Sequence, residues 1–94
     1  MYGSLNFVNA NITVLLPHAI KGMNGCVIDS TDTAHDIIID VQALDNIALL
    51  GAQVTNCDGI TSASVSSKGD FACVISPAYN TWVVMSRQGT WAQQ

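Results

Sequence analysis

Short apolar segments separated by turn residues follow one another along the whole chain. In 11–17 the side chains of Ile12, Val14 and Leu16 fall on one face of a strand, and similar segments rich in β-branched residues recur between Gly, Asn, Asp and Pro. Apolar residues at helical spacing are absent outside 41–53. The pattern predicts about eight short strands, spaced roughly 8–12 residues apart, rather than helices.

The strands with the clearest boundaries end at proline, glycine or paired polar residues. We predict strands over 11–17, 26–30, 36–40, 70–76 and 80–88. The last two form a closing pair around Pro77-Ala78-Tyr79-Asn80, and Pro17 ends the first because proline cannot donate to a ladder.

The middle of the chain allows two interpretations. Residues 41–53 contain a possible helical stripe, but Asp45-Asn46 is a good turn pair and Gly51 a good breaker, so we prefer strand, turn, strand. Two further strands are predicted around Asp58-Gly59, a pair that favours a tight hairpin turn.

These elements fit one small domain. A chain of 94 residues has room for a single core. We expect an all-β fold, a single small antiparallel β-sandwich or barrel of jelly-roll type. Residues 12–94 form this domain, and residues 1–11 form an N-terminal arm or the first strand.

The composition indicates a protein with partner subunits. Apolar residues make up 49% and charged residues 11% of the chain, whereas ordinary domains contain about 25% charged residues. Buried subunit contacts would explain the shortage of charge. No apolar run approaches the ~20 residues of a membrane span, and no secretory signal precedes the first strand, so we expect a complete short product with no membrane partner.

The charges argue against nucleic acid. The net charge is −4, and the basic residues Lys21, Lys68 and Arg87 are isolated from one another. Nucleic-acid binders need clustered Lys and Arg to neutralise phosphates. We therefore expect no nucleic-acid partner.

Three cysteines, Cys26, Cys57 and Cys73, form an odd number without a C-x-x-C spacing. This spacing argues against a disulfide framework and against a zinc site. Cys26 and Cys73 lie in apolar runs, where a free cysteine acts as a small hydrophobic residue. Cys57 lies on a predicted turn and is the better candidate for an exposed thiol.

The histidines and aspartates offer weak signals for chemistry. His35-Asp36 lacks the Gly-framed serine of a catalytic triad, and His18 has no ligand at metal-binding spacing. The acidic group consists of Asp29, Asp32, Asp36 and Asp40, and it lacks the spacing and the glycine of a calcium loop. We predict turn-capping aspartates, with no catalytic residue, no metal and no cofactor.

Bulky aromatic residues gather near the C-terminus. Trp82 is predicted to anchor the closing hairpin in the core or between subunits, with Tyr79 at its turn, and Trp91 is predicted to contact another chain. A ligand platform is less favoured because no convergent polar groups accompany the rings. With three residues of the N-terminal segment, the predicted partner interface contains Tyr2, Leu5, Phe7, Tyr79, Trp82 and Trp91.

The order of several segments resembles the small β-domains of tailed-phage virion proteins found in fibres, spikes and head decorations. The segments are "ITVLLP", "CVIDS", "IIID", "ISPAYNTWVVMS" and "GTW", which together span Ile12 to Trp91. The chain departs from that family at Pro77-Ala78-Tyr79-Asn80, where Asp-Gly is usual, and in 41–59, which is poorer in Gly and Thr. The resemblance implies a homotrimer with a structural role and no enzymatic activity.

Among such roles, a short chain without a fibre shaft favours a capsid decoration or cement protein. It would assemble in the host cytoplasm and lie on the capsid surface of the virion as a homotrimer that bridges capsomers, with the major capsid protein as its partner. Residues 1–11 would lie across the shell or add a strand to a capsid protein. The alternative is a tail-fibre or spike module that binds a host glycan or protein receptor, and a β-sandwich hydrolase or metal enzyme is the least favoured class.

Overall fold

A computed structural model describes residues 3–31, 35–49, 52–54, 59–62 and 68–93. Within these ranges the chain forms ten strands and no helix. The strands are β1 (Ser4–Val8), β2 (Ile12–Leu15), β3 (Asn24–Asp29), β4 (Ile37–Asp40), β5 (Asn46–Leu49), β6 (Ala52–Val54), β7 (Ile60–Thr61), β8 (Phe71–Ala78), β9 (Thr81–Gln88) and β10 (Ala92–Gln93). The all-β prediction is therefore confirmed for the part of the chain that the structure describes.

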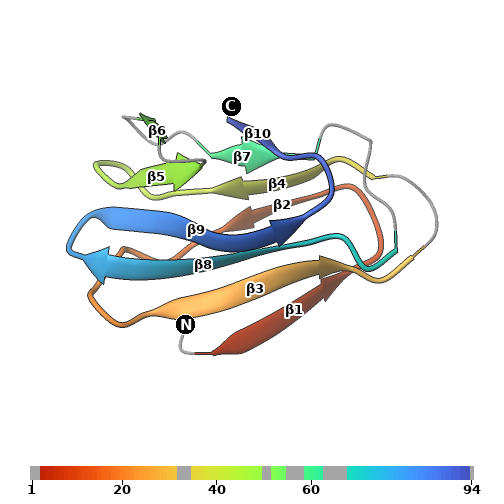
Figure 1. Ribbon diagram of the computed structural model, residues 1–94, viewed down its shortest axis with the longest axis horizontal. Coiled ribbons are helices and arrows are strands. Elements are labelled where there is room, and N and C mark those ends of the chain that lie inside the picture. The colour runs from red at the N-terminus through yellow and green to blue at the C-terminus, as the bar shows by residue number, and fades with distance from the viewer. Residues whose placement is uncertain (1–2, 32–34, 50–51, 55–58, 63–67, 94) are drawn as a thin grey trace.

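The strands form two sheets (Figure 1). One has six strands in the order β1-β3-β8-β9-β5-β6, and the other has four in the order β10-β7-β4-β2. β8 and β9 form the antiparallel closing pair that the sequence predicted. This hairpin lies at the centre of the larger sheet. Its turn is tighter than the sequence suggested, since the strands extend to Ala78 and from Thr81, and Asn80 takes a positive φ of 64°.

The prediction of purely antiparallel pairing is wrong, because both sheets are mixed. β1 pairs with β3, β2 with β4, and β5 with β9, all in parallel. The chain alternates between sheets as it runs from β1 to β4, so β1 and β3 enter one sheet in the same direction while β2 and β4 do so in the other. Parallel pairs need a crossover connection, and the strand of the opposite sheet provides it.

The middle segment is extended rather than helical. A turn ends at Asp45, whose N–H donates to Gln42 O, and Leu44 in this turn has a positive φ of 73°. β5 then begins at Asn46 and pairs with β6.

The described strands on either side of Asp58-Gly59 do not form the predicted hairpin with each other. β6 belongs to the larger sheet, and β7 pairs with β4 and β10 in the smaller sheet. Asp58 itself lies outside the described residues.

Gly59 is required by close packing between strands. A Cβ atom at this position would lie 2.2 Å from the carbonyl oxygen of Ile39. No side chain fits in that space, so glycine allows the chain to approach β4 before it enters β7.

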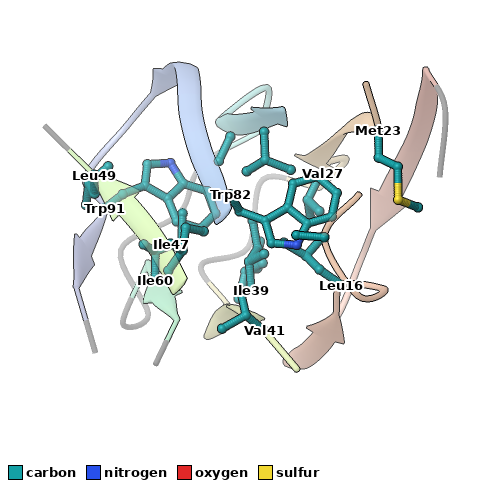
Figure 2. Packing of buried hydrophobic residues seen from close by; sticks show 14 of the residues in the cluster. Leu16, Met23, Val27, Ile39, Val41, Ile47, Leu49, Ile60, Trp82 and Trp91 are labelled. Carbon is teal, nitrogen blue, oxygen red and sulfur yellow. The ribbon is translucent and has the colours of Figure 1, made fainter. Parts of the chain in front are cut away.

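One hydrophobic cluster takes side chains from both sheets. Figure 2 shows Trp82 of β9 near its centre, with Val27 of the larger sheet and Ile39 of the smaller sheet close by. Burial alternates along β3, β4 and β8, so every second side chain points into this core. The alternation leaves the other side chains of β3 and β8 on the opposite surface of the larger sheet.

Candidate functional site

The surface of the larger sheet that faces away from the core is uncharged and largely apolar. We call it the outer face. From β1 and β3 it takes Leu5, Phe7, Asn24, Cys26 and Ile28. The register places Leu5 and Phe7 beside Cys26 and Ile28, and it places the three β3 residues opposite Ile75, Cys73 and Phe71 of β8. From β8 and β9 it takes Phe71, Cys73, Ile75 and Val83, with the polar residues Ser86 and Gln88 opposite Cys73 and Phe71. No residue of this set carries a charge.

β1 presents the most exposed part of the outer face. Leu5 and Phe7 are 60% and 67% exposed, whereas Val8, which points inward, is buried in the core cluster. Ile28, Phe71 and the other apolar residues of the outer face are partly buried by one another. A monomeric soluble protein rarely exposes a large contiguous apolar patch unless the patch binds something, so this face is the strongest candidate for a binding surface.

Of the six residues predicted to contact a partner, three are exposed. Leu5 and Phe7 lie on the outer face, and Tyr79 is 67% exposed at the tip of the β8–β9 hairpin. Tyr2 lies outside the described residues.

The two tryptophans belong to the core of the subunit. Trp82 is fully buried and its Nε1–H donates to Pro17 O at 3.3 Å. Trp91 is 6% exposed and its Nε1–H donates to Gln88 O at 3.0 Å. Both indoles are engaged in internal packing, so neither offers surface to another chain.

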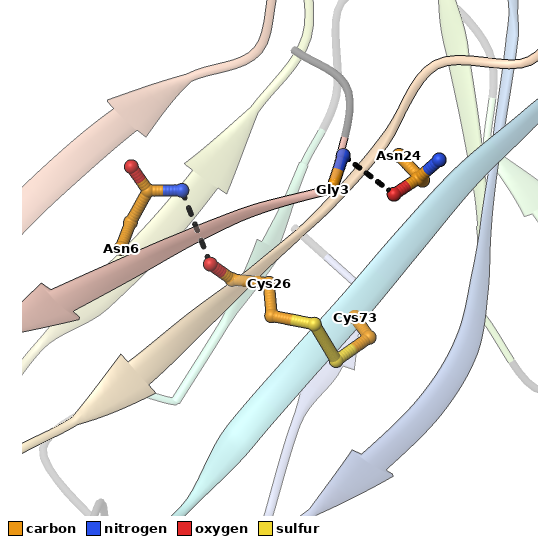
Figure 3. The surroundings of a disulfide bond; sticks show 5 residues. All are labelled: Gly3, Asn6, Asn24, Cys26 and Cys73. Carbon is orange, nitrogen blue, oxygen red and sulfur yellow. Dashed lines mark hydrogen bonds between the residues drawn. A yellow bond between two sulfur atoms is a disulfide. The ribbon is translucent and has the colours of Figure 1, made fainter.

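A disulfide joins Cys26 and Cys73, against the sequence prediction that both are free (Figure 3). The two residues stand directly opposite each other on β3 and β8, with their Cα atoms 4.0 Å apart. Because both side chains point to the outer face, the disulfide lies there, and both cysteines are partly buried. Spacing along the chain held no hint of this pair, which depends on the register between strands 47 residues apart. Cys57 lies outside the described residues.

A second polar cluster, which sequence reasoning missed, lies beside the hairpin tip. The Asp45 carboxylate is fully buried, and its Oδ2 accepts from the Ala19 N–H at 2.8 Å while Oδ1 lies 3.0 Å from His18 Nδ1. The His18 ring meets Tyr79 edge to face, with centroids 4.8 Å apart. This cluster holds the loop before β3 against the turn before β5. A buried carboxylate next to a His orients the ring.

Two of the described aspartates in 29–40 accept backbone hydrogen bonds through their carboxylates. Asp29 Oδ1 accepts from the Thr31 N–H at 3.0 Å, and Asp40 Oδ1 accepts from the Val41 N–H at 3.1 Å. Both contacts are of the turn-capping kind that the sequence predicted. Asp32 lies outside the described residues, and within those described no group of three potential metal ligands is found.

His35 and Asp36 make hydrogen bonds at the start of β4. His35 Nε2 is hydrogen-bonded to Thr31 Oγ1 at 2.8 Å, and its carbonyl accepts from Ser62 Oγ at 3.0 Å. The Asp36 N–H donates to Asn11 Oδ1 at 2.9 Å. These contacts fasten the start of β4 to its neighbours.

A shallow hollow of about 230 Å³ lies over β2 and β4. Its lining consists of Asn11, Ile12, Thr13, Asp36 and Ile38. Small-molecule sites usually measure roughly 300–1,000 Å³ and gather several convergent polar groups, so this hollow is a weaker candidate than the outer face. No helix suited to crossing a membrane occurs in the described part of the chain.

Comparison of the chain with protein-family models, with curated proteins and with solved structures gave no match.

Proposed function

We propose that the protein is a capsid decoration or cement protein of a tailed phage. It seats on the head surface as a homotrimer at threefold or quasi-threefold positions, contacts the major capsid protein and bridges neighbouring capsomers. The observation that carries the proposal is the outer face, an uncharged and largely apolar surface on a chain with a net charge of −4. The phage setting comes from the resemblance of the segments between Ile12 and Trp91 to virion β-domains.

The finer architecture belongs to the same proposal. Two sheets that share one core cluster pack as a sandwich. Three copies in one assembly provide the buried contacts that account for the shortage of charged residues. A trimer also gains avidity, because each modest contact raises the effective concentration of the next.

The role we propose is structural rather than enzymatic. His35, Asp36 and Asp29, which were the residues of the sequence most suited to chemistry, make hydrogen bonds that fix turns and strand ends. The His18–Asp45 pair likewise joins two loops. These groups are engaged in holding the fold.

The disulfide supports a place on the virion surface. Disulfides form and persist in oxidising surroundings, which include virion surfaces, and are rare in the reducing cytosol. A protein assembled in the host cytoplasm would carry Cys26 and Cys73 as thiols and would oxidise them after release.

The second candidate is a tail-fibre or spike module that binds a receptor. The exposed Tyr79 ring at the hairpin tip favours it, because aromatic side chains stack on sugars and His18 holds this ring from the side. If the protein binds glycans, loses that binding on Tyr79→Ala and does not bind heads, the receptor-binding module is the correct candidate.

The capsid proposal is tested by binding to heads that lack the protein. Ile75→Asp places a carboxylate on the outer face in β8, which β3 separates from β1, and should lower co-sedimentation with heads at least tenfold. Leu44→Asp is the matched control, since Leu44 is the exposed apolar residue of a turn outside that face. Equal binding by Ile75→Asp and the wild type, with both folded by circular dichroism, would overturn the proposed docking face.

A further inference from the structure

We propose that β1 pairs antiparallel with β1 of a second copy of this chain, about a twofold axis that passes through Asn6. β1 is an edge strand, bonded on one side to β3 and, within the described residues, to no strand on the other. The inference concerns self-association and goes beyond the contact with the capsid.

The backbone of β3 shows which residues of β1 face the open edge. The carbonyl oxygen of Met23 accepts a hydrogen bond from the Ser76 N–H on the β8 side of β3. Backbone groups alternate in direction along a strand, so the N–H and C=O groups of Asn24 and of every second residue after it point toward β1. Ser30 follows this alternation, and its N–H donates to Val8 O at 2.9 Å. Val8 and Asn6 therefore direct their backbone groups to β3.

Leu5 and Phe7 direct their N–H and C=O groups the other way, because these groups alternate in direction along a strand. An edge with open donors and acceptors is a template for another strand. The open edge of β1 is thus formed by the backbone of the same two residues whose side chains are most exposed on the outer face.

A twofold axis at Asn6 satisfies this edge. It places Leu5 of one copy opposite Phe7 of the other, and each such pair exchanges both of its main-chain hydrogen bonds. Asn6 then stands opposite Asn6 without main-chain bonds between them. This is the alternation of bonded and non-bonded pairs that an antiparallel ladder requires.

The side chains agree with that register. Leu5 and Phe7 point to the outer face, so the pairing sets each leucine beside the phenylalanine of the other copy, where cross-strand apolar pairs stabilise a sheet. The two outer faces then join into one continuous surface across the axis.

The distribution of charge favours a second copy at β1. Residues 1–20 contain no Asp, Glu, Lys or Arg, and β1 has neither the lysine nor the proline that usually protects an edge strand. Two copies with a net charge of −4 each can meet there with one nearby carboxylate per copy, that of Asp29 beside Val8 on β3, and this side chain is buried within its own subunit. The other edge strand of this end of the chain, β2, lies beside Asp36 and Asp40 at the two ends of its partner β4, so pairing at β2 would bring acids closer.

The contact closes at two copies by itself, and at six where the copies also form the proposed trimer and the twofold axis meets the threefold axis at right angles. Sedimentation equilibrium of the intact chain should therefore give a mass of two or six chains. Phe7→Lys should halve it, because each copy then sets a charged ammonium group against Leu5 of the other in place of an apolar ring. Leu15→Lys, an equally exposed apolar residue on the β2 edge, should leave the mass unchanged.

Two more variants test the backbone and the register. Phe7→Pro removes the N–H that points to the second copy, and it leaves every hydrogen bond between β1 and β3 in place. This variant should also halve the mass. Asn6→Cys, combined with Cys57→Ser, should give a covalent dimer on oxidation, with a peptide map in which the two substituted positions are linked to each other. Thr13→Cys on β2, combined with the same Cys57→Ser change, should give no covalent dimer.

A wild-type mass of one or three chains would overturn the inference, as would a Phe7→Lys protein of wild-type mass. Halving by Leu15→Lys in place of Phe7→Lys would move the contact to β2 and overturn it too. Failure of the folded wild type to bind heads would contradict the proposed function and leave the β1 contact standing, so the two proposals fail separately.

Discussion

Cys26 and Cys73 face each other across β3 and β8 and close a loop of 47 residues with a disulfide. A cross-link of this span restricts the unfolded chain and should contribute about 2–4 kcal/mol to the free energy of unfolding. Cys73→Ser, or reduction of the wild type, should lower the denaturation midpoint accordingly, while Cys57→Ser should not. Thiol titration of the oxidised protein should find one free thiol in denaturant, and three would contradict the pairing.

Asp45 should contribute more to stability than its partner His18. Asp45→Ala leaves the buried N–H of Ala19 without its acceptor, which costs about 1–3 kcal/mol. His18→Ala should cost less, since the His18 side chain is partly exposed and water replaces its partner. Chemical denaturation of the two single variants and the double variant measures both terms, and a larger loss for His18→Ala would contradict the assignment.

The aromatic residues of the closing hairpin should separate into core and surface. Trp82→Ala empties the centre of the core and should destabilise the fold by about 3–5 kcal/mol. Tyr79→Ala, three positions away and exposed, should change the free energy of unfolding by about 0.5 kcal/mol or less. Thermal unfolding followed by circular dichroism compares the two, and similar losses would show that Trp82 is not in the core.

Trp91 should behave as a core residue in solution. Its indole is buried within the subunit, so its fluorescence should stay blue-shifted when the protein is diluted below any association threshold. A Trp82→Phe protein isolates the Trp91 signal. A red shift of that signal on dilution would instead support the sequence prediction that Trp91 contacts another chain.

Local pattern predicted the strands well and their partners poorly. The apolar alternation around Val27, Val74 and Trp82 is a property of each segment, and it correctly placed β3, β8 and β9. Whether Leu5 lies beside Cys26 in parallel, or Cys26 opposite Cys73, depends on how distant segments cross between sheets. No short window contains that information.

Local pattern also explains which residues of the candidate site could be predicted from the sequence. Leu5 and Phe7 could be predicted as surface because they precede the first clear strand and alternate with polar residues. The His18–Asp45 contact could not, because it joins loops 27 positions apart that have no shared motif. A lone His after a proline and an Asp in a turn pair carry no common signal until the two loops are packed together.

The location of the protein in virions decides between a role on the head and a role on the tail. Gold-labelled antibody, or density in images of intact particles compared with particles that lack the protein, shows where it binds. A capsid decoration protein gives label or density on the head at threefold or quasi-threefold positions. Heads that lack the protein are then less resistant to heat. Signal confined to the tail or its fibres would contradict a capsid decoration role.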